Sequence, residues 1–203
     1  MIKTLYPCFQ HWSEKGSVYL ISDTHFDDPD REYMGYNISN MEQAYCLYET
    51  CHKNDTLIHL GDVGNPEWLK GLKCYKVLIM GNHDKADVKE YFDEVYTGPL
   101  WVAEKLVLSH EPIVIEDTHF GMRIAFNIHG HDHGKNFWDD KYHLNICQNV
   151  YGYIPLNLNQ FIKSGYLKRV KDIHRLTIDN AIANKETEGI LHEWYTDTGV
   201  ENV

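Results

Sequence analysis

Five short apolar runs, each ending shortly before a side chain able to bind a metal ion, constrain this chain more than any other feature of its sequence. The runs are four or five residues long, mostly aliphatic, and flanked by glycine and polar residues, as is typical of buried strands. In sheets made from such strands, the functional loops gather at the carboxyl ends. The sequence therefore predicts a group of Asp, Asn and His side chains at one end of a sheet. The runs cover residues 18–21, 56–60, 76–80, 105–108 and 125–128.

Helical signals lie between these runs. Ser39 and Glu42 form the S-x-x-E pattern of a capping box, which predicts the start of a helix. Asn65 followed by Pro66 is typical of an N-cap with proline in the first helical turn. Because the predicted strands alternate with helical segments, we expect an α/β fold with a layered core. The predicted helices cover about 40–51, 66–72, 87–92 and, mostly, 158–183.

Composition is that of an ordinary soluble protein. The 203 residues fit one domain, and no apolar run approaches the roughly 20 residues needed to span a bilayer. The N-terminal segment lacks the continuous apolar stretch of a signal peptide, so we expect a cytoplasmic protein with no membrane partner. Five scattered cysteines without a C-x-x-C pair argue against a disulfide framework. The net charge of −11 makes long nucleic acid an unfavourable partner, and the sequence leaves the oligomeric state open.

The motifs that follow the apolar runs are weak signals when each is taken alone. Asp23 and His25 lie two residues apart, so on an extended segment both point to one side and can reach one cation. The same spacing relates His131 to His133. Either pair is more often a structural or surface feature, and Asn82 after a glycine is commonly a turn residue. Their combination along one chain favours a metal site.

Five motifs occur in order: Asp23-x-His25, Gly61-Asp62, Gly81-Asn82-His83-Asp84, His110, and Gly130-His131-x-His133. This ordered set resembles the calcineurin-like metallophosphoesterase superfamily, especially its small single-domain bacterial or phage-type members. The resemblance extends from about residue 18 to residue 161. It implies a layered β-sandwich of two mixed sheets flanked by helices. We expect the metallophosphoesterase domain to cover residues 1–161, and a C-terminal helical extension and tail to cover 162–203.

The resemblance also implies a site for two divalent metal ions. We expect Mn²⁺ first, with Fe, Zn²⁺, Co²⁺ or Ni²⁺ as alternatives, because the ligands are imidazole, carboxylate and amide groups. A shared carboxylate would hold the two ions about 3.5–4 Å apart. The ligands expected for the first metal are Asp23, His25, Asp62 and His133. Those expected for the second are Asp62, Asn82, His110 and His131.

The chemistry implied is phosphoester hydrolysis. A hydroxide bridging the metals would attack phosphorus, and His83 would act as general acid toward the departing oxygen. Asp84 would orient and charge the ring of His83. The alternative to this catalytic role is that His83 is a surface histidine in a turn. Among the other histidines, we expect His59 to be a satisfied core residue and His129 to pack or to support the ligands.

The substrate expected is a small phosphoester, a nucleotide-type phosphodiester in particular. Residues 63–65 read Val-Gly-Asn, where protein serine/threonine phosphatases carry a phosphate-binding arginine, so a phosphoprotein is disfavoured. A phosphomonoesterase of the same fold is the first alternative. A metal-binding scaffold without catalysis, or a metal sensor or store, is the second.

Overall fold

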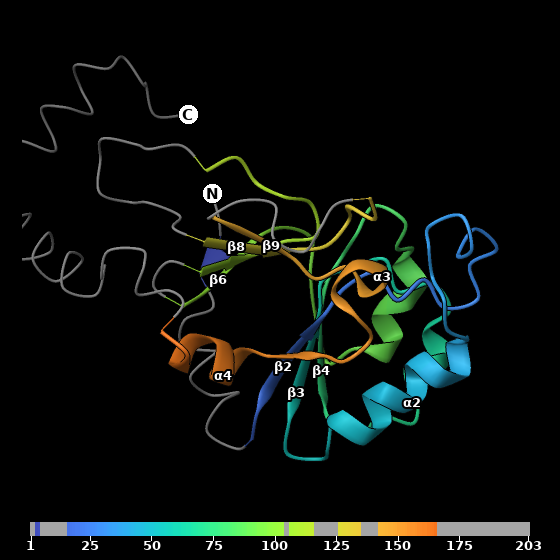
Figure 1. The fold of residues 1–203 in the computed structure, drawn as a ribbon. Helices are drawn as coiled ribbons and strands as arrows, with labels where there is room; N and C mark the ends of the chain where they lie inside the picture. Colours follow the sequence, from blue (N-terminus) through green and yellow to red (C-terminus); the bar gives the residue numbers. More distant parts are fainter. Residues whose placement is uncertain (1–2, 5–15, 104–105, 116–125, 135–141, 166–203) are drawn as a thin grey trace, which may run out of the picture.

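Two stacked β-sheets form the centre of the protein (Figure 1). The computed structural model describes residues 3–4, 16–103, 106–115, 126–134 and 142–165. Each sheet has parallel and antiparallel neighbours, so the predicted α/β sandwich of two mixed sheets is confirmed. One sheet has the order β1 (Lys3–Thr4), β6 (Leu100–Ala103), β7 (Leu106–Leu108), β8 (Phe126–His129) and β9 (His143–Asn145). The other has the order β10 (Leu156–Asn157), β2 (Val18–Ile21), β3 (Thr56–His59), β4 (Tyr75–Ile79) and β5 (Glu94–Tyr96).

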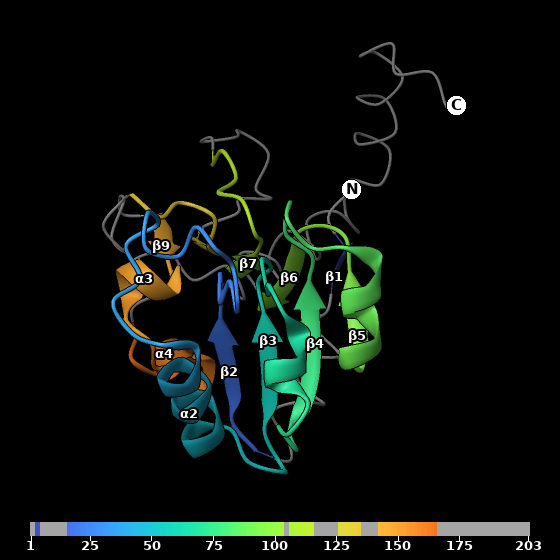
Figure 2. The same ribbon diagram turned by 90° about the vertical axis from the view of Figure 1, so that its right-hand side faces the viewer.

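All five predicted apolar runs are strands, and their ends lie within one residue of the predicted ones. Three of them, β2, β3 and β4, are parallel neighbours in one sheet, as Figure 2 shows. The other two, β7 and β8, are parallel neighbours in the second sheet. Because a parallel bridge joins Ser22 after β2 to Cys147 after β9, the carboxyl ends of the two sheets meet at one edge of the sandwich.

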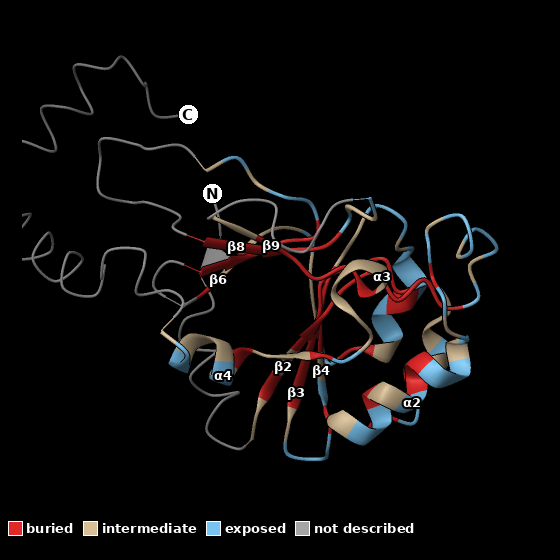
Figure 3. Cartoon of the chain, viewed as in Figure 1, coloured by how far each residue is buried: buried red, intermediate tan, exposed pale blue. Residues whose placement is uncertain are grey.

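The sheet that contains β2, β3 and β4 is buried on both faces. On its inner face, Leu20, Ile58 and Val77 pack with side chains from β6, β7 and β8 in one hydrophobic core. On its outer face, Leu57 packs with Leu47 in a second core beneath the helices. Consecutive residues of β3 thus enter different cores, as strand geometry requires. Figure 3 shows these strands buried between the layers.

Helices are present at all four predicted places; three of them are shorter than predicted, and η2 has the predicted length but begins one residue earlier. Helix α2 (Asn40–Thr50) begins with the predicted capping box: the Glu42 amide donates to the Ser39 hydroxyl at 3.2 Å, and the Ser39 amide donates to the Glu42 carboxylate at 2.9 Å. The segments η1 (Pro66–Leu69) and η2 (Ala86–Tyr91) are 3₁₀ helices. Segment η1 ends before residue 72 because the Gly71 amide donates to the Tyr48 hydroxyl at 3.1 Å.

Two short helices complete the described chain, α3 (Gln148–Tyr151) and α4 (Leu158–Lys163). The predicted helix over 158–183 ends at Lys163, because Gly165 adopts a φ of 76° and such a residue terminates helices. The rest of that helix, and most of the predicted extension 162–203, lies outside the described residues. The domain boundary at 161 stays a prediction, although Phe161 and Ile162 pack against the inner core. The described residues contain no helix long and apolar enough to cross a membrane.

We predict that Ser39→Ala lowers the free energy of unfolding by about 1 kcal/mol, because α2 loses the acceptor for its first-turn amide. Urea unfolding followed by circular dichroism measures this change. Glu42→Gln is the control, since glutamine can keep the reciprocal bond of a capping box. A Ser39→Ala protein as stable as the wild type would contradict the prediction.

Candidate metal centre

The predicted metal ligands all lie in loops at the carboxyl ends of strands from both sheets. Asp23 and His25 follow β2, Asp62 follows β3, and Asn82 follows β4. The remaining ligands follow strands of the other sheet: His110 after β7, then His131 and His133 after β8. The structure therefore brings together every residue of the predicted set.

The first cluster consists of Asp23, His25 and His133, whose ligand atoms lie within 4.8 Å of one another. The Nε2 atoms of His25 and His133 lie 3.9 and 3.6 Å from Asp23 Oδ1. Asp23 and His25 are buried, and His133 is half-buried. Three such atoms converging on one point form a coordination set of the type that binds divalent metals.

The second cluster consists of Asp62, His110 and His131, again within 4.8 Å of one another. The amide oxygen of Asn82 lies 2.8 Å from His110 Nε2 and 3.1 Å from His131 Nδ1, so this oxygen joins the cluster. Asn82 and His131 are exposed, whereas Asp62 and His110 are buried. The cluster is therefore open to solvent on the Asn82 side.

A single carboxylate oxygen connects the two clusters. Asp62 Oδ2 lies 3.6 Å from His25 Nε2 in the first cluster and 3.3 Å from His110 Nε2 in the second. Burial alone would raise the pKa of Asp62. The hydrogen bond and charge of His110, together with the His83 amide, outweigh burial and hold this pKa at about 2. Asp62 therefore stays ionised and can bridge two cations.

The free atoms of the first cluster fit a metal ion. Asp23 Oδ1 and His25 Nε2 are buried, and the described residues offer neither of them a hydrogen-bond partner. A buried polar atom without a partner is unfavourable unless something binds it. The opposite ring nitrogens are already engaged: His25 Nδ1 lies 2.9 Å from Asp28 Oδ2, and His133 Nδ1 lies 2.9 Å from Asn149 Oδ1. These contacts orient the rings as outer partners orient metal-binding histidines.

Hydrogen bonds on both ring nitrogens orient His110 in the second cluster. Its Nδ1 donates to the Leu60 carbonyl at 2.9 Å, so Nε2 faces Asp62 and Asn82. Burial lowers the pKa of His110, but the Asp62 hydrogen bond and the charges of Asp23 and Asp62 outweigh it and raise this pKa. The surrounding oxygens thus attract positive charge to the position that a metal would occupy.

The loops that carry the ligands have unusual backbone conformations. Asp23, His25, Asp62 and His131 all have positive φ, between 43° and 68°, which is strained for residues other than glycine. Hydrogen bonds between loops maintain this conformation, since the Asp23 amide donates to the Gly61 carbonyl at 2.9 Å and the His25 amide to the Asp62 carbonyl at 3.1 Å. Strain of this kind gathers at functional sites.

Two glycines leave room for the ligand carboxylates. A Cβ on Gly130 would lie 2.1 Å from Asp23 Oδ2, and a Cβ on Gly81 would lie 2.2 Å from Asp62 Oδ1. The Gly-x patterns at these two motifs therefore reflect close approach of the backbone to each carboxylate.

Several residues that support the ligands were not predicted. Arg31 Nη1 donates to the carbonyls of Thr24 and His25 at 2.6 and 3.1 Å, and the Tyr36 hydroxyl donates to the Asp23 carbonyl. The Arg31 guanidinium also lies 4.3 Å from the centre of the Tyr36 ring. One sequence signal was available, because Arg31 is the sole Lys or Arg between residues 16 and 52.

Two further buried histidines, His59 and His129, lie outside the two clusters. His59 is fully buried, its Nδ1 accepts from the Gly61 amide at 3.1 Å, and its Nε2 lies 2.9 Å from the Thr24 hydroxyl. Burial lowers the pKa of His59 to about 3, so the ring is neutral. His129 is also buried, with Nδ1 donating to the Gly130 carbonyl at 2.8 Å.

His83 lies at the solvent-exposed side of the metal centre. Its ring is exposed, with its centroid 5.7 Å from that of His25, and its amide donates to Asp62 Oδ1 at 2.9 Å. The backbone of His83 is thus fixed to the bridging carboxylate, while the ring faces the open side.

From the sequence we expected Asp84 to orient the His83 ring, but its observed contacts are different. Its carboxylate instead accepts three backbone amides: those of Asp62 and Gly81 on Oδ2, at 2.9 and 2.8 Å, and that of Val63 on Oδ1, at 2.9 Å. Among the described residues, no hydrogen bond joins this carboxylate to the His83 ring. Asp84 therefore connects the loops after β3 and β4 and fixes the backbone of Asp62.

We predict that Asp84→Asn weakens Mn²⁺ binding by about 10- to 100-fold, because an asparagine amide nitrogen cannot accept a backbone N–H. At least one of the three amides loses its acceptor, and the Asp62 loop shifts. Isothermal titration calorimetry with Mn²⁺ measures the affinity. Asp87→Asn, an exposed change in η2, is the matched control. Equal affinity in the two variants would show that Asp84 does not position the site.

Two mixed sheets with paired Asp/His clusters at the carboxyl ends of their strands define a metallophosphoesterase fold. Residues 17–146 match the calcineurin-like phosphoesterase superfamily domain, and the chain belongs to that superfamily. The match covers more than half of the chain. Members of this superfamily typically bind divalent metals, although some of them are not catalytic.

One solved structure supports the fold independently. The crystal structure of AQ665, a protein of unknown function from Aquifex aeolicus, is similar with a TM-score of 0.57 and 27% sequence identity. The likeness covers 72% of this chain and 98% of that one. A comparison with curated proteins gave no match.

Proposed function

We propose that this protein is a two-metal-dependent phosphoester hydrolase, and that it acts as a phosphodiesterase on a small nucleotide-type substrate. The observation that carries the proposal is the position of Asp62 Oδ2, which lies within 3.6 Å of one imidazole nitrogen from each cluster. A shared carboxylate oxygen between two ligand sets is the geometry that two-metal hydrolysis needs.

The charges of the ligand set favour a phosphate. Two bound divalent cations would supply a water acidic enough to ionise near neutral pH, and positive charge for the phosphate oxygens. The chain provides two carboxylates, Asp23 and Asp62, while Asn82 and the imidazoles are neutral ligands. Two carboxylates do not neutralise two divalent cations, so the loaded centre attracts an anion. The exposed side near Asn82 and His131 is where the substrate enters.

His83 is the residue we assign to proton transfer. Its ring lies at the exposed side, next to the His25 ring, and its backbone is fixed by the bond to Asp62. A histidine in this position can hold a proton and deliver it to the oxygen that leaves phosphorus. Asp84 acts indirectly, because it positions the backbone of Asp62.

A small substrate suits the loop after β3 and the charge of the chain. The loop continues after Asp62 with Val63, which is buried, and Gly64, which has a φ of 76°. Neither residue has a cationic side chain that could bind phosphate. The net charge of −11 repels long polyanions. A compact phosphodiester fits these conditions better than a phosphoprotein or a long nucleic acid.

We predict that His83→Ala lowers kcat on bis-p-nitrophenyl phosphate with Mn²⁺ by about 10²- to 10⁴-fold while Mn²⁺ binding is retained. Asp62→Ala removes the shared ligand, so both activity and binding of the metal pair should be lost. His52→Ala, at an exposed position away from the site, is the control. Initial rates and calorimetry measure the two properties.

The alternatives give different results in these assays. If the wild-type rate equals that of His83→Ala and Asp62→Ala, the protein is not a hydrolase of this kind. Tight metal binding without any turnover would favour a scaffold or a metal store.

We predict that treatment with EDTA abolishes hydrolysis and that Mn²⁺ restores it better than Zn²⁺, Co²⁺, Ni²⁺ or Fe²⁺ does. The restored enzyme should favour 2′,3′-cyclic, 3′,5′-cyclic or dinucleotide phosphodiesters over phosphomonoesters. The measurement is kcat/KM for each pair of metal and substrate. A profile confined to monoesters would refute the diester preference.

A further inference from the structure

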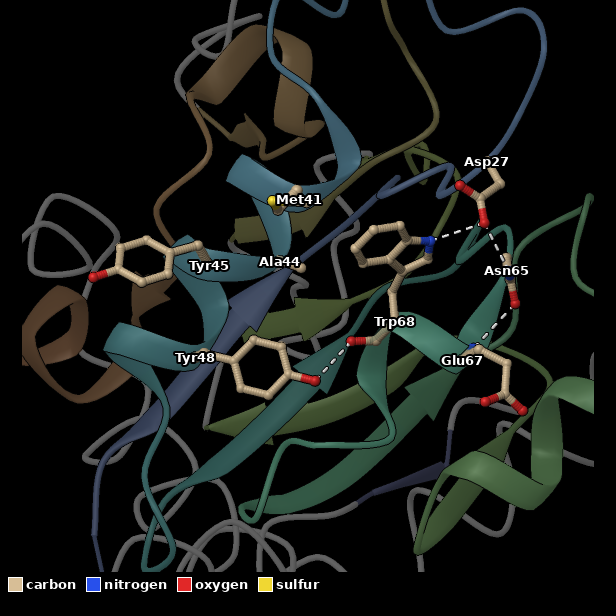
Figure 4. Close-up of a pocket in the computed structure, with 8 residues that line it drawn as sticks. All are labelled: Asp27, Met41, Ala44, Tyr45, Tyr48, Asn65, Glu67 and Trp68. Atoms are coloured by element: carbon tan, nitrogen blue, oxygen red, sulfur yellow. Dashed lines mark hydrogen bonds between the residues drawn. The ribbon is translucent and has the colours of Figure 1, made fainter.

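A groove lies between α2 and η1 (Figure 4). Its volume of about 520 Å³ is within the usual range for small-molecule sites. The small side chain of Ala44 leaves the space open, and the rings of Tyr45, Tyr48 and Trp68 border it. An aromatic-lined hollow with polar groups at one end is the form of a site for a flat ligand.

Two of the three rings are held in place by the protein. Trp68 stacks on Phe26 with ring centroids 5.9 Å apart and an angle of 20° between the planes. The Tyr48 hydroxyl donates to the Trp68 carbonyl at 3.1 Å. The third ring, Tyr45, is 63% exposed, and its hydroxyl makes no hydrogen bond with any described residue. The groove is thus preformed, and Tyr45 is free to cover a ligand.

The groove and the metal centre share the same two loops. Asp27 comes two residues after His25, and Asn65 three residues after Asp62. The loops run side by side, since the Asn65 amide donates to the Phe26 carbonyl at 2.7 Å. Three residues of chain span at most about 11 Å, so the Cα of Asn65 lies within that distance of the Cα of Asp62. The end of the groove that Asp27 and Asn65 line is therefore formed by the two loops that carry His25 and Asp62.

The charge of the groove is opposite to that of a loaded metal centre. The Asp27 carboxylate accepts from Asn40, Asn65 and Trp68 at 2.6, 2.7 and 2.8 Å, and all three donors are neutral. Its negative charge is therefore not cancelled by these bonds. The exposed Glu67 adds a second carboxylate to the lining. Such a groove repels phosphate and favours an uncharged ring that carries N–H donors.

We propose that this groove binds the base of the substrate, and specifically a nucleobase with an amino group. The ring would lie among Tyr45, Tyr48 and Trp68, and its N–H donors would face Asp27. The phosphate of the same molecule would lie at the metal centre, so this inference rests on the proposed function. The groove then determines which diesters the protein selects.

Adenosine, which has no phosphate, tests the groove without catalysis or metal. Calorimetry in EDTA should show that adenosine binds the wild type, and that Tyr45→Ala weakens binding at least about fivefold, the lower limit for loss of a stacking ring. Tyr45→Phe should bind like the wild type, because the ring is kept. Tyr33→Ala, which removes another exposed tyrosine (91% exposed) outside the groove, is the matched control. Alanine is favourable in helices, so Tyr45→Ala should keep α2 folded. Absence of adenosine binding, or equal binding to Tyr45→Ala, overturns the proposal.

Two esters with the same leaving group test whether the groove serves the substrate. Tyr45→Ala should raise KM at least about fivefold for adenosine 5′-(p-nitrophenyl phosphate) and leave KM for methyl p-nitrophenyl phosphate unchanged. An equal change for both esters, or no change for either, overturns the assignment of the groove to the substrate. If neither ester is hydrolysed while adenosine still binds in a Tyr45-dependent way, the proposed hydrolysis fails and the nucleoside site stands.

Discussion

The carboxylate of Asp62 is the group on which the rest of the site depends. One of its oxygens accepts the amide of His83 at 2.9 Å, and the other lies between His25 and His110. The first contact fixes the position of the exposed histidine, and the second joins the two ligand clusters. Asp84 in turn holds the Asp62 amide, so the loops after β3 and β4 are fixed relative to each other. A displacement of Asp62 would therefore disturb both clusters and His83 together.

Positive φ angles at four ligand residues have a cost, and the surrounding contacts offset it. Each of these backbone conformations costs roughly 1–3 kcal/mol relative to an ordinary one. Arg31 donates to the carbonyls of Thr24 and His25, and Tyr36 donates to that of Asp23. These side chains hold the first ligand loop from behind, which leaves the metal-facing atoms of Asp23 and His25 without partners. These contacts orient the loop that carries Asp23 and His25, as outer contacts orient metal-binding residues.

Much of the fold could be predicted because its signals are local. Strand patterns and the capping box at Ser39 depend on neighbouring residues, and the structure has them where predicted. The gathering of the Asp and His side chains into two clusters could be predicted from the order of their motifs. The role of Asp84 could not, because its partners are backbone amides, two of which lie 21 and 22 residues away. Asn149 was missed for a similar reason, since it contacts His133 across 16 residues and belongs to no motif.

Each cluster takes ligands from both sheets, and this has a consequence for folding. Asp23 and His25 belong to the sheet of β2, whereas His133 belongs to the sheet of β8; Asp62 and His110 are divided in the same way. Neither sheet alone supplies every side chain of either cluster, so a metal ion held by a whole cluster would require the two sheets to be packed together. An ion that binds the assembled state and not the open one stabilises it by mass action, in proportion to the logarithm of metal concentration over the dissociation constant. Metal supply in the cell would then set how long the sandwich resists opening, and with it the lifetime of the protein against proteolysis.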